Sequence, residues 1–442
     1  MLQNDTIAAL ATAPGEGGIA IVRVSGPAAA ALLEKLFAPA VPWEPRKMYY
    51  GHIRFESETL DECMAVLMPG PKSYTREDVA EIHLHGGAWA AGSVLRALYQ
   101  LGARPAEPGE FTRRAFMNGR VDLSRAEAVM ALISAEGGRA ARAAVRQLQG
   151  GVSGFIRSAQ EELLSLLSGA AAAIDYPEEI STEEAAGDLE KGARRLADKL
   201  EKACDERGAR IVQDGLEAVL CGRPNVGKSS LLNALARQER AIVTDIPGTT
   251  RDVIRADVMI DGLRVHFSDT AGLREGADAI ERIGVDRARQ AMAGADAVLL
   301  VFNAAEDWTD ADQRLLDETK DAPRVIVLNQ CDRPLRLDPA RFERPVLISA
   351  KTGDGLAELE KRVAAFGAGA GESALTQQRH IALARKAASS LRNAADACAR
   401  GDAVDLCAID LQDALHALGQ VTGEQVDEKM IDDIFSRFCV GK

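Results

Sequence analysis

The stretch Gly222-Arg-Pro-Asn-Val-Gly-Lys-Ser229 decides how this sequence is interpreted, because it fits the pattern Gly-x-x-x-x-Gly-Lys-Ser/Thr. An apolar run, 216–221, precedes it as a buried strand would, and a run with helical spacing, 230–236, follows it. A strand that leads through a Gly-rich turn into a helix directs backbone N–H groups and the positive helix end at a phosphate. Lys228 would reach the β- and γ-phosphates, and the Ser229 hydroxyl would ligate magnesium. The alternative is a chance Gly-rich turn, which further motifs downstream exclude.

Two segments supply groups that a magnesium-bound γ-phosphate requires. Gly248-Thr-Thr-Arg-Asp252 contains Thr250, whose hydroxyl would sense the γ-phosphate and complete the magnesium shell. The next predicted strand ends in Asp269-Thr-Ala-Gly272. Asp269 would hold magnesium through water, and the Gly272 N–H would donate to the γ-phosphate.

Two later segments indicate guanine as the base. Asn329-Gln-Cys-Asp332 follows an apolar run at the carboxyl end of a predicted strand, where open α/β sheets bind ligands. The Asp332 carboxylate would accept from the ring N–H and the exocyclic amine of guanine, a pair that adenine lacks. The Ala350 N–H would meet the guanine carbonyl. The residues predicted to contact GTP are Asn225, Val226, Gly227, Lys228, Ser229, Ser230, Thr244, Asp245, Ile246, Pro247, Gly248, Thr249, Asp269, Thr270, Ala271, Gly272, Asn329, Asp332, Ser349, Ala350 and Lys351.

Two positions depart from the usual GTPase pattern. Gln330 stands where a lysine stem normally packs on the base, so we expect weaker nucleotide affinity with the base preference kept. Leu273-Arg-Glu275 follows the Asp-x-x-Gly segment, so the glutamine that orients water in Ras-like GTPases is missing. Among the acidic residues of 274–282, Glu281 is the leading candidate for a catalytic residue that positions or activates water.

A monovalent cation is expected to replace an arginine finger. The side-chain carbonyl of Asn225 would coordinate potassium beside the phosphates, with Thr244, Ile246 and Thr249 completing the shell from a turn-rich loop. The alternative for Asn225 is a turn residue that stabilises the loop.

The whole chain predicts an α+β domain, a helical domain and a Ras-like α/β GTPase domain inserted in the helical one. Residues 1–118 alternate apolar and polar side chains with frequent Gly and Pro, as α+β domains do. The first helical part, 119–213, has helical spacing over 124–173, with a capping box predicted at Ser124-Arg-Ala-Glu127, and again after 175–179 through about residue 210. The second part, 367–442, has helical spacing over 375–400 and 404–438. The second helical stretch is too short for a good core alone. Helices on both sides of the GTPase segment, 214–366, are therefore expected to pack together.

Composition limits which partners the protein is expected to bind and in which cellular compartment it is expected to work. The net charge of −13 argues against RNA binding through a broad basic surface, so a partner would supply much of any phosphate binding. No stretch approaches the run of about 20 apolar residues that spans a bilayer, and no signal-peptide pattern opens the sequence. Seven cysteines without a Cys-x-x-Cys pair indicate neither a disulfide framework nor a zinc site. We therefore expect the reducing cytoplasm.

Together these motifs resemble the tRNA-modification GTPase family MnmE (TrmE), in the potassium-activated branch of translation GTPases. The resemblance rests also on the segments Asn4–Gly26, Pro108–Arg120 and Phe438–Lys442, and it covers essentially the whole chain. It implies work with a flavoprotein partner, MnmG (GidA), in a heterotetramer or larger complex. Together they would install a carboxymethylaminomethyl-type group on the five-position of the wobble uridine of tRNA.

The resemblance also implies that the first domain binds a 5-formyl- or methylene-tetrahydrofolate and dimerises. It selects Arg23, Glu81, Arg120 and Lys442, with Arg120 in place of an expected lysine. Glu81 would accept paired hydrogen bonds from a pterin, whereas the arginines suit glutamate carboxylates or a formyl oxygen. The alternatives are a surface charge for Arg23 and a structural ion pair for Glu81.

Cys439 lies on the terminal tail, where the resemblance implies either a catalytic thiol or a contact that closes the ligand pocket. His83 and His85 alternate along a predicted strand, and without a third ligand they are interpreted as ordinary strand histidines.

The sequence thus predicts a GTP hydrolase that acts in tRNA wobble-uridine modification and uses GTP, magnesium, potassium and a folate. A homodimer in the absence of nucleotide is expected, because pairing of GTPase domains would complete the catalytic site. The alternatives are a ribosome-assembly GTPase switch and a folate-dependent methyltransferase with a regulatory GTPase.

Overall fold

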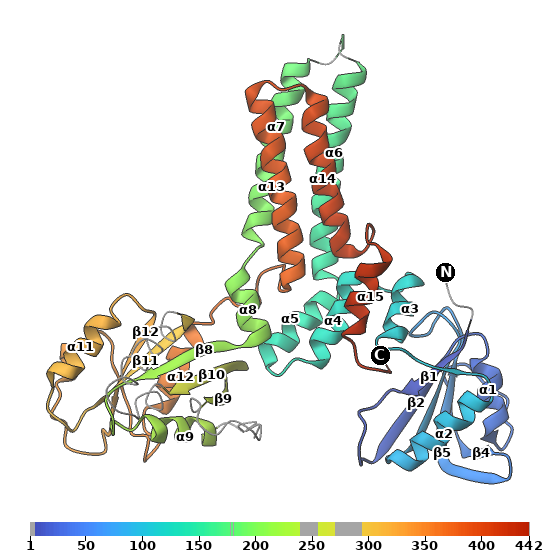
Figure 1. Cartoon of the computed structure of the whole chain (residues 1–442), viewed down its shortest axis with the longest axis horizontal. Helices are drawn as coiled ribbons and strands as arrows, with labels where there is room; N and C mark the ends of the chain where they lie inside the picture. The colour runs from blue at the N-terminus through green and yellow to red at the C-terminus, as the bar shows by residue number, and fades with distance from the viewer. Residues whose placement is uncertain (1–4, 177, 180, 239–254, 270–293, 442) are drawn as a thin grey trace, which may run out of the picture. The chain divides into compact units, whose positions relative to one another are not determined.

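The computed structural model describes residues 5–176, 178–179, 181–238, 255–269 and 294–441 (Figure 1). The contacts between residues divide the chain into two compact units. The first contains residues 1–130, 147–167 and 412–442, and the second contains 131–146 and 168–411.

The first unit is built on a mixed sheet that two helices cover on one face. The strand order is β3-β4-β5-β6-β2-β1-β7. Apolar residues of the helices, such as Leu33 and Leu98, are buried against Val22 and Ile82 of the central strands. The elements are β1 (Ile7–Leu10), β2 (Ile19–Ser25), α1 (Ala29–Leu36), β3 (Phe37–Ala38), β4 (Met48–Phe55), β5 (Glu58–Met68), β6 (Val79–His85), α2 (Ala88–Gln100) and β7 (Arg104–Pro105). This confirms the predicted α+β character.

The opposite face of this sheet carries a row of paired residues. Tyr50 of β4 pairs with Met64 of β5, Met64 pairs with His83 of β6, and His83 pairs with Ile21 of β2. Directly opposite residues project to the same face. Arg23 therefore lies on this face too, because it is two residues from Ile21 and pairs with Glu81.

Helical segments complete the first unit. They are α3 (Glu110–Met117), α4 (Leu123–Ile133), the first part of α6 (Gly151–Asp175), the end of α14 (Val404–Thr422) and α15 (Glu428–Ser436). Leu123, Phe435 and Phe438 form a common apolar cluster. The predicted capping box at Ser124 is wrong. Asp122 caps α4 instead, because its Oδ1 accepts from the Arg125 N–H at 3.0 Å and its carbonyl from the Ala126 N–H.

The second unit contains a largely parallel sheet in the order β13-β12-β11-β8-β10-β9, in which only the β9–β10 pairing is antiparallel among the described strands. Helices lie on both faces, so β11 is buried along its whole length. The elements are β8 (Leu216–Cys221), α9 (Lys228–Gln238), β9 (Arg255–Ile260), β10 (Leu263–Asp269), β11 (Ala297–Asn303), α11 (Asp310–Glu318), β12 (Arg324–Asn329), η2 (Pro339–Arg341), β13 (Val346–Leu347) and α12 (Leu356–Ala365).

Helices from both sides of the GTPase segment pack together, as predicted. They are α7 (Thr182–Lys202) and α13 (Gln378–Arg400), which run side by side in Figure 1. Arg194 of α7 binds Asp396 of α13 at 2.9 Å, and Arg392 of α13 binds Asp198 of α7 at 2.5 Å. The insertion of the GTPase domain in a helical domain is thereby confirmed.

The other helical segments of the second unit include α8 (Glu206–Asp214), most of α5 (Gly138–Leu148), the last part of α6 and the first part of α14. The helix predicted to continue to about residue 210 is interrupted. It ends at Lys202, and α8 begins after Asp205, whose Oδ1 accepts from the Gly208 N–H at 2.9 Å. Within the described ranges, no helix combines the length and apolar character that a membrane span requires.

Candidate functional site

The phosphate loop, residues 222–229, joins β8 to α9, and close contacts shape its backbone. A Cβ atom added at Gly222 would lie 2.4 Å from the Val301 carbonyl oxygen. Gly227 has φ +94°, and a Cβ atom there would lie 2.3 Å from Asn329 Nδ2. Both positions therefore require glycine. The loop leads into the N-terminus of α9 at Lys228, which suits an anion.

The Lys228 ammonium is held inside the phosphate loop. Its side chain is 4% exposed, and Nζ donates to the carbonyl oxygens of Gly222 at 2.9 Å and Arg223 at 2.8 Å. Ser229 and Ser230 are exposed in the first turn of α9. The lysine is thus positioned by the loop, while the two hydroxyl-bearing residues remain accessible.

Asn225 is exposed and takes the left-handed conformation, with φ +64°. Asparagine tolerates this conformation better than most residues, which agrees with a turn residue. The neighbouring Val226 is buried in the sheet core. Asn225 is therefore presented at the surface of the loop, where its side-chain carbonyl is available to a ligand.

Asn329 links three segments of the predicted nucleotide site. Its side chain is 1% exposed at the end of β12. Nδ2 donates to the Val226 carbonyl oxygen at 2.9 Å, and Oδ1 accepts from the Ala350 N–H at 3.1 Å. One amide thus fixes the phosphate loop against the segment predicted to meet the guanine carbonyl. The sequence motif predicts that Asn329 contacts the nucleotide, but it does not indicate this connecting role.

Asp332 is exposed, and a hydrogen bond from the buried Ser349 orients its carboxylate. Ser349, which is 1% exposed, donates from Oγ to Asp332 Oδ1 at 2.9 Å and accepts from the Thr352 N–H at 3.2 Å. Gln330, at φ +67°, has a buried Oε1 without a hydrogen-bond partner among the described residues. Lys351 is exposed beside them.

Part of the predicted GTPase site lies outside the described residues. This holds for Thr244, Asp245, Ile246, Pro247, Gly248, Thr249, Thr250, Thr270, Ala271, Gly272 and the proposed catalytic Glu281. Asp269 is described only as the last residue of β10. The roles assigned to all of these residues remain predictions.

A second site lies on the open sheet face of the first domain, around Arg23 and Glu81. Arg23 Nε donates to Glu81 Oε1 at 2.8 Å, and the two side chains are 15% and 17% exposed. His83 Nε2 lies 3.5 Å from Glu81 Oε2. The neighbouring His85 Nδ1 instead contacts Asp61 Oδ1 at 2.9 Å, and the described residues contain no metal-ligand cluster.

The C-terminal tail lies against this site. Val440 pairs with Pro108 in an isolated antiparallel bridge, and the Gly109 N–H donates to the Cys439 carbonyl oxygen at 3.3 Å. A Cβ atom on Gly441 would lie 2.0 Å from the Leu10 carbonyl oxygen, so this position also requires glycine. Arg23 Nη1 lies 3.5 Å from the Gly441 carbonyl oxygen. The tail therefore reaches Arg23 while the Cys439 side chain stays exposed; Lys442 lies outside the described residues.

Tyr74, which no sequence motif indicates, lies against both Arg23 and Arg120. The guanidinium carbon of Arg23 lies 5.2 Å from the Tyr74 ring centroid, and that of Arg120 lies 4.7 Å from it. Arg120 Nη1 also donates to the Tyr74 carbonyl oxygen at 3.1 Å. Neither its sequence neighbours nor its spacing mark Tyr74 as special. Only the folded chain places it between two predicted ligand contacts.

Comparison with known proteins identifies the family. Residues 6–120 match the family model described as GTP-binding protein TrmE N-terminus, and residues 123–439 match the MnmE helical domain. Three relatives carry the name tRNA modification GTPase MnmE. The Enterococcus faecalis protein is 44% identical, over 100% of this chain and 99% of that protein. The Chloroflexus aurantiacus protein is 45% identical over 99% and 100%, and the Listeria innocua protein 42% over 100% of both.

The chain belongs to the MnmE family of tRNA modification GTPases. Membership confirms the predicted family, and with it the enzyme class, a GTP hydrolase. The family resemblance noted in the sequence is thus carried by both the first domain and the helical region into which the GTPase domain is inserted.

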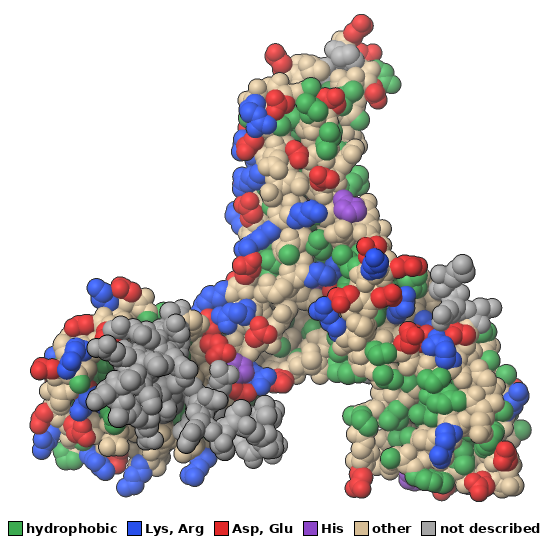
Figure 2. Space-filling model, viewed as in Figure 1, with side chains coloured by type: hydrophobic (Ala, Val, Ile, Leu, Met, Phe, Trp, Pro, Cys, Tyr) green, Lys and Arg blue, Asp and Glu red, His purple; other side chains and the backbone are tan. Residues whose placement is uncertain are grey.

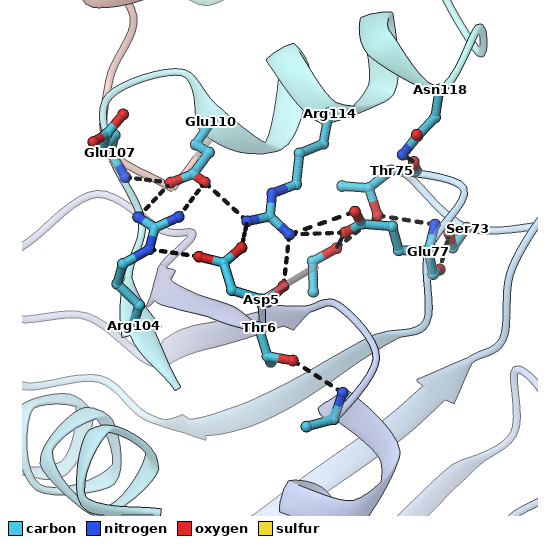
Figure 3. A network of polar contacts seen from close by, with 12 residues as sticks. Asp5, Thr6, Ser73, Thr75, Glu77, Arg104, Glu107, Glu110, Arg114 and Asn118 are labelled. Atoms are coloured by element: carbon cyan, nitrogen blue, oxygen red, sulfur yellow. Dashed lines mark hydrogen bonds and ion pairs between the residues drawn. The ribbon is translucent and has the colours of Figure 1, made fainter. Parts of the chain in front are cut away.

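The first domain of this MnmE-family chain also contains a partly buried ionic network (Figure 3). Arg114 of α3 is 8% exposed and donates to Asp5 Oδ1 at 2.6 Å and to Glu110 Oε1 at 2.9 Å. Arg104 donates to the same two carboxylates at 2.8 and 2.6 Å. Burial alone would raise the pKa of Asp5 and Glu110, but hydrogen bonds from both arginines outweigh it and lower both values. The network therefore holds charged carboxylates in place.

Proposed function

We propose that this protein hydrolyses GTP as part of a tRNA modification reaction. The observation that carries the proposal is the Asn329 side chain, which joins the phosphate loop to Ala350, beside Asp332 supported by Ser349. Because Asn329 fixes the phosphate loop relative to the predicted base contacts at Asp332 and Ala350, the site favours a guanine nucleotide bound in a single orientation. Ser229 and Thr250 would hold magnesium, with Asp269 acting through water, and the ion would neutralise charge that develops on the phosphates.

A second cation, potassium, is proposed at Asn225 with the loop 244–249. The exposed, left-handed Asn225 supports this, since the geometry leaves its amide carbonyl free to face a ligand. Potassium would then place positive charge where the transition state develops negative charge. Glu281 would position the attacking water. We expect Asn225→Ala to remove most of the rate difference between potassium and sodium chloride while GTP affinity stays within about threefold. Equal wild-type rates in the two salts would contradict the cation site.

The first domain is proposed to bind a one-carbon tetrahydrofolate that supplies carbon for the wobble-uridine group. Arg23, Glu81 and Arg120 would contact it, with Lys442 and Cys439 contributed by the tail. The residues present fit such a ligand, because a carboxylate for a pterin and guanidinium groups for carboxylates lie within one small area. The flavoprotein partner MnmG would supply redox chemistry.

A homodimer is proposed through the open face of the first sheet. Ile19, Tyr50 and Met64 are 63%, 65% and 44% exposed on that face, which is unusual for large apolar side chains in one area. On the face shown in Figure 2, basic and acidic side chains are interspersed rather than gathered, which supports a partner that provides tRNA contacts. The seven thiols are free, as suits work in the cytoplasm.

The decisive experiment is mass spectrometry of tRNA nucleosides from cells that lack the gene, complemented with wild type or Asp332→Asn. We expect the five-position group on the wobble uridine to disappear in the deletion, to return with wild type and to stay absent with Asp332→Asn. Ser349→Ala is the matched control, because it removes a support of Asp332 and keeps the carboxylate, and it should restore the group partly. An unchanged nucleoside profile in the deletion would favour the ribosome-assembly alternative.

A further inference from the structure

Two guanidinium groups lie over the ring of Tyr74, which attracts each of them but also holds two like charges close together. A guanidinium group over a tyrosine ring is attracted by the ring quadrupole and by stacking. Arg23 and Arg120 both use the same ring, at 5.2 and 4.7 Å, so two like charges are held near each other. Such repulsion is tolerated where an anion is going to be bound, because the anion then relieves it.

The two cations are not equally compensated. Arg23 pairs with Glu81 at 2.8 Å and lies 5.6 Å from the Phe111 ring centroid. Arg120 is exposed, and none of the carboxylates described in the structure forms an ion pair with it. Among the described residues, the acceptor of its hydrogen bond is the Tyr74 carbonyl oxygen. The uncompensated charge at Arg120 is therefore the place for the anionic part of a ligand.

Packing and a hydrogen bond hold the Tyr74 ring in place. Tyr74 is half-buried against an apolar cluster that includes Phe111, and its hydroxyl lies 2.9 Å from Oγ1 of the fully buried Thr112. A ring held by packing and by a hydrogen bond loses little further freedom when the arginines stack on it. This makes Tyr74 suitable as a preorganised support.

The loop that carries Tyr74 is also tied to the segment that carries Arg120. Asn118 Nδ2 donates to the Thr75 carbonyl oxygen at 2.7 Å, and Arg76 Nη1 to the Gly119 carbonyl oxygen at 3.3 Å. Glu77, two residues further along, accepts from Arg114 of α3 at 3.3 Å. Figure 3 shows the Asn118–Thr75 and Glu77–Arg114 contacts within the ionic network. The loop and the end of α3 are therefore held as one piece.

We infer that Tyr74 is a positioning residue that sets the spacing of Arg23 and Arg120, so that Arg23 with Glu81 faces the neutral, hydrogen-bonding part of a ligand and Arg120 its anionic part. The inference rests on the proposed folate function and deepens it, since it assigns different ends of one ligand to two arginines. It also explains why arginine serves at position 120: a lysine ammonium cannot stack on the ring as a planar guanidinium does.

A double-mutant cycle on 5-formyltetrahydrofolate affinity, measured by calorimetry with the full-length protein, tests the inference. Tyr74→Leu should weaken binding about tenfold, whereas Tyr74→Phe, which keeps the ring, should stay within about threefold. In an Arg120→Lys background, Tyr74→Leu should cost only about twofold more, because one of the stacked cations is already gone. Equal losses for Tyr74→Phe and Tyr74→Leu, or purely additive effects, would overturn the positioning role.

A ligand-free measurement separates this inference from the folate proposal. In NMR spectra the arginine Nε–Hε signals of Arg23 and Arg120, assigned with lysine variants, should carry a ring-current shift. Tyr74→Leu should abolish this shift and Tyr74→Phe should keep it; the same spectra verify that both variants are folded. If the shifts are present but wild type binds no 5-formyltetrahydrofolate, the folate proposal fails, and the assigned ligand ends fail with it. If wild type binds and Tyr74→Leu binds equally well, only the role of Tyr74 fails.

Discussion

The predicted nucleotide site of the second unit and the Arg23–Glu81 site of the first are built in opposite ways. The phosphate loop is one continuous segment that requires glycine at Gly222, against the Val301 carbonyl, and at Gly227, against the Asn329 side chain. The first-domain site collects side chains from separate strands, a loop and a helix end, and it includes the Gly441 carbonyl from the C-terminal tail. A contiguous motif keeps its local geometry when one side chain changes. A site assembled from distant segments depends on the network that holds those segments.

The largest expected effect is on the ionic network of the first domain. Arg114→Met should lower the free energy of unfolding of the first domain by about 3–5 kcal/mol, because it leaves the buried Glu110 and the partly exposed Asp5 each without one of two cations. The measurement is denaturant unfolding followed by tryptophan fluorescence. Arg113→Met is the matched control: Arg113 pairs with Asp432 at 2.9 Å, but both side chains are solvent-accessible, so its loss should cost about 0–1 kcal/mol. Similar losses for the two variants would break the comparison.

Lys228→Ala should act on binding and leave stability nearly unchanged. The lysine ammonium is expected to form charge-assisted bonds to the phosphates, so its removal should weaken GTP binding by about 100-fold. Fluorescent-nucleotide titration measures the affinity, and Lys351→Ala, which changes an exposed lysine elsewhere in the site, serves as a comparison. A Lys228→Ala protein that unfolds as readily as Arg114→Met would show that the phosphate loop is not locally determined.

Asp332→Asn should change the base that is bound. The carboxylate accepts two hydrogen bonds from guanine, whereas an amide can donate to the oxygen that xanthine carries at the same ring position. We expect GTP affinity to fall about 10- to 100-fold and xanthosine triphosphate affinity to rise. Competition titrations with GTP, ATP and xanthosine triphosphate check this. Equal competition by ATP and GTP against wild type would remove Asp332 as the base reader.

The smallest expected effect is a pH dependence confined to the first domain. The pKa of Asp5 and the pKa of Glu110 are lowered from their ordinary values of 3.8 and 4.5. A lowered carboxylate pKa stabilises the folded state above the ordinary value, and this contribution is lost as the pH falls through the folded-state pKa. Unfolding midpoints of the first domain should therefore be flat from pH 7 to about pH 5 and fall below about pH 4. Asp5→Asn should flatten that fall; an unchanged profile would exclude the network as its source.

The same contrast explains what could be predicted. The phosphate loop, the base-reading segments and the α/β character follow from contiguous motifs and from apolar runs such as 216–221, because local backbone geometry and strand burial depend on neighbouring residues. The first domain was recognised from segment resemblance, and its α+β pattern from strand alternation. The α4 cap was misplaced by two residues, because Ser124 and Asp122 are both good caps. In the folded chain Asp122 accepts from the Arg125 N–H, whereas the Ser124 hydroxyl contacts Asp122 and Ser153.

By itself, the sequence determined the fold class, the family and the order of the GTPase motifs, since each is written in residues adjacent along the chain. Tertiary structure alone decided that Asn329 joins the phosphate loop to Ala350, that Gly441 brings the tail to Arg23, and that Tyr74 meets both Arg23 and Arg120. These contacts join residues that are tens to hundreds of positions apart. Their existence depends on how sheets and helices pack, and no local propensity or spacing encodes that packing.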